Sequence, residues 1–118
     1  MPQVEIEFYR TEKGECPTED FLDSLDDKMA AKMLRAISYL AANGYELREP
    51  VSKVLEDGIL EIRARQGSDI TRALYFFTIG NKAVITHGFV KKTQKTPRDQ
   101  IEKAKKYRVD YKMRNNLK

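Results

Sequence analysis

Apolar side chains near the start of the chain recur at every second position, which is the period of a half-buried strand. They are Val4, Ile6 and Phe8, and they alternate with glutamate and tyrosine. We expect this first strand to end near Arg10. Apolar spacings of three and four residues follow, so the pattern predicts a strand and then helical structure.

Two helices are predicted after this strand. Pro17 suits the first turn of a helix, and acidic residues follow it where the helix dipole favours negative charge, so a short helix should reach about Leu25. A longer second helix has apolar residues at helical spacing: Met29, Met33, Ile37, Leu40 and Ala41. Asn43-Gly44 provides its left-handed stop. The two helices should pair as a hairpin.

Three strands in an antiparallel meander are predicted further along the chain. Residues 45–58 contain Pro50 and an Asp57-Gly58 turn signal, and we expect them to be mainly loop. The strands, which are rich in β-branched, aromatic or alternating residues, then cover residues 60–65, 70–79 and 83–90. The last strand is the most apolar, so we place it centrally in the sheet.

A C-terminal helix is predicted to begin at Thr96-Pro97, with the Thr96 hydroxyl as N-cap and Pro97 at the first helical position. The 118 residues, 41% of them hydrophobic, suffice for one modest core. The expected fold is therefore a single α+β domain over residues 1–118. It has a small antiparallel sheet, an N-terminal helical hairpin and a C-terminal helix, with the helices on one face of the sheet.

Cysteine content and the length of apolar runs indicate the cellular compartment. Cys16 is the single cysteine, so it cannot form an internal disulfide, and the first residues have neither the basic nor the apolar region of a secretory signal. No apolar run approaches the roughly 20 residues of a membrane-spanning helix. We therefore expect a cytoplasmic protein that does not associate with membranes.

The formal net charge of +4 conceals a division along the chain. Residues 1–27 contain nine acidic and two basic side chains, a balance of −7, and the remaining residues therefore carry +11. Such asymmetry favours a polyanionic partner for the basic part, because neutralised phosphates release condensed counterions. The alternative is an ordinary solvated surface.

Arginines on two predicted strands could form a cationic face. Arg63 and Arg65 lie two residues apart and so project from the same face. Across the hairpin turn we expect Arg65 and Arg72 to be near neighbours, with Arg63 one pleat further along. Lys91 and Lys92 at the end of the last strand would extend this face. Crowded like charges favour an anion site, although an antiparallel sheet can also have a solvated outer face.

The segment after the last strand adds Lys95, so three lysines cluster where a rigid strand ends, a place that suits phosphate. His87, the single histidine, shares strand parity with Ile85 and Phe89 and could either transfer protons or pack in the core. Phe76 could stack on a base beside the cations or fill the core. The sequence lacks the spacings of zinc, calcium and nucleotide sites, so no metal or cofactor is expected.

Three segments in this order, residues 55–65, 71–77 and 87–97, resemble the phage-derived, HigB-like branch of the RelE/ParE toxin superfamily. The similarity covers nearly the whole chain, and the string from His87 to Pro97 is its most specific part. The resemblance implies a RelE-like fold and the toxin of a type II toxin–antitoxin pair, a prophage-type endoribonuclease (mRNA interferase) that cleaves mRNA, often on the ribosome.

The resemblance also implies roles for particular residues. In related toxins, cations on the second and third strands of the sheet hold the scissile phosphate, and the resemblance assigns this role to Arg63 and Arg72. Cations near the end of the last strand correspond to Lys91 or Lys92. The ribose 2′-oxygen would attack phosphorus and give a 2′,3′-cyclic phosphate without a metal. Guanidinium groups match phosphate geometry, and Lys91 or Lys92 could act as acid or base. The residues expected to bind RNA around them are Arg65, His87, Lys95 and Phe76.

Partners and alternative functions follow from the same resemblance. It implies a helix-turn-helix antitoxin encoded by an adjacent gene, which would cover the cationic face with acidic residues. A gyrase-inhibiting toxin of the ParE type shares the fold without needing a phosphate-cleaving cluster. A non-catalytic module that binds RNA or an acidic antitoxin is a third reading, and the density of strand cations favours RNA cleavage.

Overall fold

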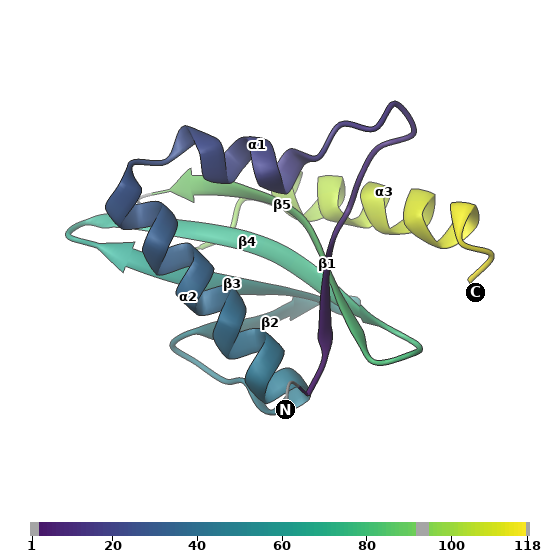
Figure 1. The fold of residues 1–118 in the computed structure, drawn as a ribbon, viewed down its shortest axis with the longest axis horizontal. Helices are drawn as coiled ribbons and strands as arrows, with labels where there is room; N and C mark the ends of the chain where they lie inside the picture. The colour runs from purple at the N-terminus through teal and green to yellow at the C-terminus, as the bar shows by residue number, and fades with distance from the viewer. Residues whose placement is uncertain (1–2, 92–94, 118) are drawn as a thin grey trace.

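The computed structural model describes residues 3–91 and 95–117. Its centre is a five-stranded sheet in the order β1-β5-β4-β3-β2 (Figure 1). The strands are β1 (Glu5–Phe8), β2 (Ser52–Glu56), β3 (Ile59–Gln66), β4 (Asp69–Thr78) and β5 (Lys82–Lys91). Strand β1 pairs in parallel with β5, and the other neighbours are antiparallel. The middle place belongs to β4, while the apolar β5 lies beside it between two neighbours.

The helices confirm the predicted order of elements. They are α1 (Pro17–Ser24), α2 (Asp27–Asn43), the short 3₁₀ helix η1 (Gly44–Glu46) and α3 (Arg98–Arg114). The Asp26 carboxylate caps α2 by accepting a hydrogen bond from the Met29 N–H at 2.8 Å. Gly44 ends this helix with a φ of 53°, a conformation that glycine adopts without strain. The α+β fold class is confirmed.

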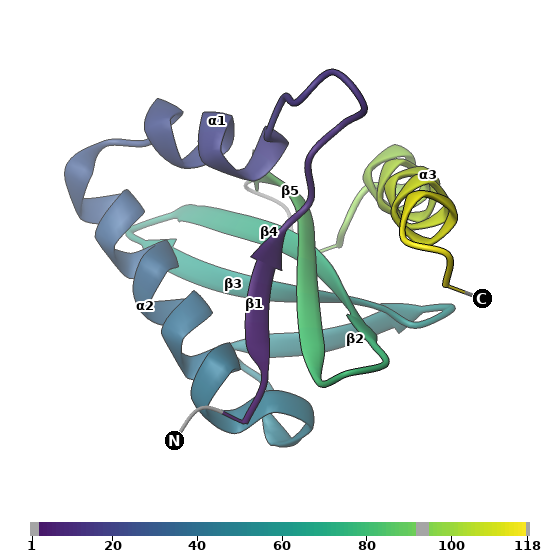
Figure 2. The ribbon, with the colours of Figure 1, turned by 45° about the vertical axis from the view of Figure 1, so that its right-hand side comes forward.

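The helices lie on both faces of the sheet, which corrects the expectation of a single covered face. Helices α1 and α2 lie on one side, and α3 crosses the other (Figure 2). On the first side, α2 packs against Ile62, Ala73 and Tyr75 of the sheet. On the second side, Ala104 and Tyr111 of α3 pack against buried sheet residues: Ile59, Leu74, Phe76 and Val84. The central strands are apolar on both faces, so each face needs a cover.

The strand β2 was not predicted, because Pro50 and the Asp57-Gly58 turn made residues 45–58 look like loop. Ser52 pairs with Ile62 and Val54 with Leu60, and the register shifts between Val54 and Glu56. A short edge strand has one neighbour and little apolar patterning, so its signal in the sequence is weak.

Helix α3 is tied to the beginning of the chain by polar side chains. The Tyr9 hydroxyl donates to Asp110 Oδ2 at 2.5 Å, and the Tyr111 hydroxyl donates to Glu7 Oε1 at 3.1 Å. The Arg114 guanidinium bonds both Asp110 and the backbone carbonyl of Arg10. These contacts join residues about a hundred positions apart, so the two ends of the domain fold as one unit. Within residues 3–91 and 95–117, no helix is both long and apolar enough to cross a membrane.

Candidate functional site

Arginines from β3 and β4 meet near the beginning of α3, on the face of the sheet that α3 covers. The register places Arg63 directly opposite Arg72, and Arg65 opposite Ile70. We expected Arg65 to be nearer to Arg72 than Arg63 is, and the order is the reverse: the two-residue turn at Gly67-Ser68 aligns Arg63 with Arg72 and leaves Arg65 one pleat nearer the turn. The predicted convergence of Arg63 and Arg72 on one face is present.

Glu61 lies at the centre of this group and was not anticipated from the sequence. Its side chain is completely buried, and its Oε2 accepts a hydrogen bond from Arg63 Nε at 2.5 Å. Its Oε1 accepts the hydroxyl proton of Thr96. Glu61 precedes Arg63 by two residues on the same strand, so alternation could have predicted that the two side chains share a face. The burial of Glu61 could not be predicted in this way. A buried carboxylate needs such partners.

Arg72 is held inside the same network. Its side chain is 0% exposed, and its Nη1 donates to Thr96 Oγ1 at 3.2 Å. Burial lowers the pKa of Arg72, the charge of Arg63 lowers it further, and the charge of Glu61 opposes both effects. An arginine remains protonated at neutral pH even so. Arg72 is fully buried here and bonds Thr96, so its contact with a phosphate stays a prediction, and in this structure it lies among the residues that hold the cluster together.

Thr96 links the three charged residues. Its hydroxyl donates to Glu61 and accepts from Arg72, which uses the hydroxyl group as both donor and acceptor. It therefore does not cap α3 as predicted: the N-cap of α3 is Pro97, and no side chain caps that helix. We call Glu61, Arg63, Arg72 and Thr96 the buried ionic cluster.

The accessible side of the cluster is formed by Arg63 and Arg65. The Arg63 side chain is 18% exposed, and Arg65 is exposed. Together with Pro50, Val51 and Ile70 they line a hollow of about 330 Å³. In the part of the chain that the structure describes, the Arg65 guanidinium makes no ion pair. Two arginines beside an open hollow are suited to bind an anion such as phosphate.

The three expected lysines lie at the end of β5 or follow it in the sequence. The backbone of Lys91 pairs with Ile70, which brings the end of β5 to the same hollow. The Lys91 side chain and all of Lys92 lie outside the described residues. Lys95 is exposed and lines a different hollow, of about 300 Å³, with Lys53 and Thr96. Through Thr96, this second hollow adjoins the buried ionic cluster.

His87 is a packed core residue, which corrects its expected role in RNA binding. It is 3% exposed, its Nε2 lies 2.8 Å from Gln100 Oε1 of α3, and its Nδ1 lies 3.1 Å from Thr86 Oγ1. Burial lowers its pKa to about 4, so the ring is neutral at pH 7. The register shift in β5 places His87 opposite Leu74 but Ile85 opposite Tyr75, so these two residues of β5 face opposite sides.

Phe76 is also a core residue, which corrects its expected role as a stacking platform. It is 1% exposed and packs edge-on against Tyr111 of α3, with ring centroids 5.7 Å apart and planes at 73°. The ring therefore has no face available to a nucleic-acid base. The structure thus separates the predicted residues into an accessible pair, Arg63 and Arg65, and residues that support or lie away from it.

Metal ligands do not gather around this site. Among residues 3–91 and 95–117, no group of three or more histidine, cysteine, aspartate or glutamate side chains is placed to hold a metal ion. Guanidinium groups give the described part of the site its positive charge. These are held in fixed positions by a buried carboxylate and a hydroxyl, which limits the reorganisation needed when an anion binds.

Comparison with known proteins gives a family assignment. The family model described as phage derived protein Gp49-like (DUF891) matches residues 20–108, which is well over half of the chain. A search of curated proteins found no match. The matched segment includes all four residues of the buried ionic cluster as well as Arg65. The chain therefore belongs to the phage-derived, Gp49-like family of proteins.

Proposed function

We propose that this protein is the toxin of a type II toxin–antitoxin system and an endoribonuclease that cleaves mRNA. The Gp49-like family is associated with toxin–antitoxin toxins of RelE-like type, which supports the first part. The finer assignment to the HigB-like branch of the RelE/ParE superfamily is part of the proposal and rests on the resemblance of residues 87–97.

One observation supports RNA cleavage most directly. Arg63 presents a partly exposed guanidinium whose Nε is fixed at 2.5 Å by the buried Glu61, and the exposed Arg65 stands two residues along the same strand. A guanidinium that is already oriented loses little freedom when it binds a phosphate. A solvated strand face would not need a buried carboxylate beneath it.

In the proposed reaction the ribose 2′-oxygen attacks the adjacent phosphorus, and the bond to the 5′-oxygen breaks. A base takes the 2′-hydroxyl proton and an acid supplies a proton to the leaving 5′-oxygen, so the products are a 2′,3′-cyclic phosphate and a 5′-hydroxyl. Arg63 and Arg65 would stabilise the charge on the pentacoordinate phosphorus. We assign proton donation to Lys91 or Lys92 at the end of β5, and propose that no metal takes part.

The proposed partners follow from the same reaction. The substrate would be mRNA, bound while it is on the ribosome. A helix-turn-helix antitoxin from the adjacent gene would neutralise the toxin by placing acidic residues over Arg63, Arg65 and the lysines that follow β5. This complementarity agrees with the excess of positive charge beyond residue 27.

The experiment is induced expression in a bacterial host, with and without the adjacent gene, while new 5′ ends on cellular mRNA are mapped. We expect growth arrest with codon-phased cleavage, and Arg63→Ala should abolish cleavage. Arg35→Ala is the matched control, because Arg35 is an exposed arginine on α2, on the opposite face of the sheet. Arrest with intact mRNA and accumulating DNA breaks would support a gyrase poison instead, and unchanged growth would contradict a toxin.

A further inference from the structure

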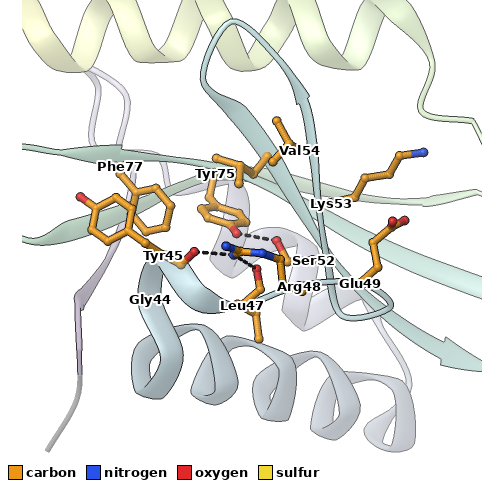
Figure 3. A pocket seen from close by; sticks show the side chains of 11 residues that line it. Gly44, Tyr45, Leu47, Arg48, Glu49, Ser52, Lys53, Val54, Tyr75 and Phe77 are labelled. Atoms are coloured by element: carbon orange, nitrogen blue, oxygen red, sulfur yellow. Dashed lines mark hydrogen bonds between the residues drawn. The ribbon is translucent and has the colours of Figure 1, made fainter.

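The outer strand β2 has a hollow on each side of the sheet. The larger hollow, about 760 Å³, lies between the loop after α2 and the sheet (Figure 3). Its aromatic and aliphatic lining residues are Tyr45, Leu47, Val54, Leu60, Tyr75 and Phe77, and its polar ones are Arg48, Glu49, Ser52 and Lys53. The smaller hollow, about 300 Å³, is lined by Leu55, Lys95 and Thr96 together with Lys53 and Val54, which line both hollows. Neither hollow is lined by Arg63 or Arg65, although the smaller one adjoins the buried ionic cluster through Thr96.

The larger hollow combines an aromatic wall with a cation. Tyr45 is 57% exposed, and its ring centroid lies 4.0 Å from that of Phe77. The Tyr75 hydroxyl lies 2.6 Å from Ser52 Oγ, and Arg48 Nη1 donates to the backbone carbonyls of Tyr45 and Leu47 (Figure 3). Within the described part of the chain, Arg48 has no acidic partner. An exposed tyrosine ring beside a guanidinium that makes no ion pair is typical of recognition surfaces.

One residue of β2, Val54, presents backbone groups to an added strand, whereas the N–H of Ser52 already donates to the Arg48 carbonyl at 3.1 Å. Arg63 N–H donates to the Val51 carbonyl at 2.8 Å, so Lys53 and Glu61 form the next hydrogen-bonded pair of this antiparallel ladder. The backbone N–H and C=O of Val54 therefore point away from β3. Val54 is also 69% exposed. An outward-facing donor and acceptor on an edge strand are the groups that an added strand pairs with.

We propose that β2 binds an extended segment of a partner protein as a sixth strand. Side chains of such a segment alternate between the two faces of the sheet, so every second one would enter the aromatic hollow and the others would reach Lys53 and Lys95. Apolar residues suit the first set and acidic residues suit the second. The segment is thus one in which apolar and acidic side chains alternate. This proposal does not depend on the chain being a nuclease.

The test uses the full chain and a fluorescein-labelled synthetic hexapeptide in which valine and phenylalanine alternate with glutamate. Fluorescence anisotropy should show saturable binding with a dissociation constant of about 100 μM or lower. Tyr45→Ala and Lys53→Glu should each weaken binding about tenfold. Val54→Pro removes the outward N–H without removing a bond to β3, and should weaken it similarly. Leu34→Ala, at an exposed position on α2, is the control and should bind normally.

Several results would overturn the proposal. One is no saturable binding at about 1 mM peptide, which is weaker than useful recognition. Equal binding of a peptide with lysine in place of glutamate would contradict the role of charge. Equal binding of a peptide N-methylated at alternate residues would contradict strand pairing. If the chain sediments as a dimer that Val54→Pro converts to a monomer, the occupant of β2 is a second copy and the partner segment is wrong. Circular dichroism establishes that each variant is folded.

Discussion

Replacing Glu61 by glutamine tests whether the buried ionic cluster holds the site together. The substitution keeps the shape of the side chain and removes its charge. Arg72, 0% exposed, would lose the nearby negative charge of Glu61, which favours its charged form, and removing one partner from a buried ionic group costs about 3–5 kcal/mol. Arg63 is 18% exposed and can recover hydration, and the glutamine amide still accepts one hydrogen bond worth about 1 kcal/mol. The net loss should be about 3 kcal/mol.

The assay is urea unfolding followed by circular dichroism. With a slope of roughly 1–3 kcal/mol per molar urea for a small domain, the midpoint should fall by about 2 M. Glu102→Gln is the matched control, because Glu102 accepts from Arg98 at 2.6 Å but its side chain is 53% exposed, so its loss should be about 0–1 kcal/mol. Equal midpoints for the two variants would refute the reasoning.

A double variant separates coupling from simple damage. If Glu61 and Arg72 stabilise each other, the combined loss in Glu61→Gln/Arg72→Met should be smaller than the sum of the two single losses by about 1 kcal/mol or more. Additive losses would show that the two residues act independently. The rate of RNA cleavage by Glu61→Gln, measured under conditions where the variant is folded, should fall because Arg63 is no longer held in a fixed orientation. The affinity for RNA should change less.

Three further predictions concern the core and the attachment of α3. The pKa of His87 is lowered by burial from 6.5 to about 4, so the unfolded chain binds a proton that the folded chain does not. Stability should therefore fall by up to about 3 kcal/mol as the pH drops through this window, and urea unfolding of His87→Phe should show a smaller fall. Tyr9→Phe removes the hydroxyl bond to Asp110, which should cost about 1 kcal/mol, and spectrophotometric titration should lose the tyrosine whose pKa is raised to about 12. Gly88→Ala places a Cβ against the ring of Phe21, so the melting temperature should fall with a loss of about 1–3 kcal/mol; an unchanged temperature would show that the ring moves aside.

The sequence predicted the elements with strong periodic patterns and missed those set by pairing. The alternation in β3 and β4 and the helical spacing in α2 come from local burial, so these elements were readable. The edge strand β2 depends on its neighbour β3, and the register shift near Thr86 reverses the side on which His87 lies. Both are products of strand pairing, which a single sequence does not specify.

The candidate site divides in the same way. That Arg63 and Arg72 share a face followed from alternation along each strand. Burial of Arg72 and Glu61 was not visible, because charged residues on a strand are usually exposed, whereas here both side chains are buried and bond Thr96, which lies far along the chain. Thr96 had a local explanation as a helix cap, and its actual contact with Glu61 spans 35 positions in the sequence.

The dependence of the site on the end of the chain has a consequence for the order of synthesis. Thr96 and α3 are made after every strand, and α3 is fastened to residues 7–10 by side chains of its last two turns. While these residues are still inside the ribosome, Glu61 and Arg72 have no hydroxyl between them and no helix above them. A nascent chain from which α3 has not yet emerged therefore carries an unassembled site, and its arginines take up their fixed positions only after this helix has docked.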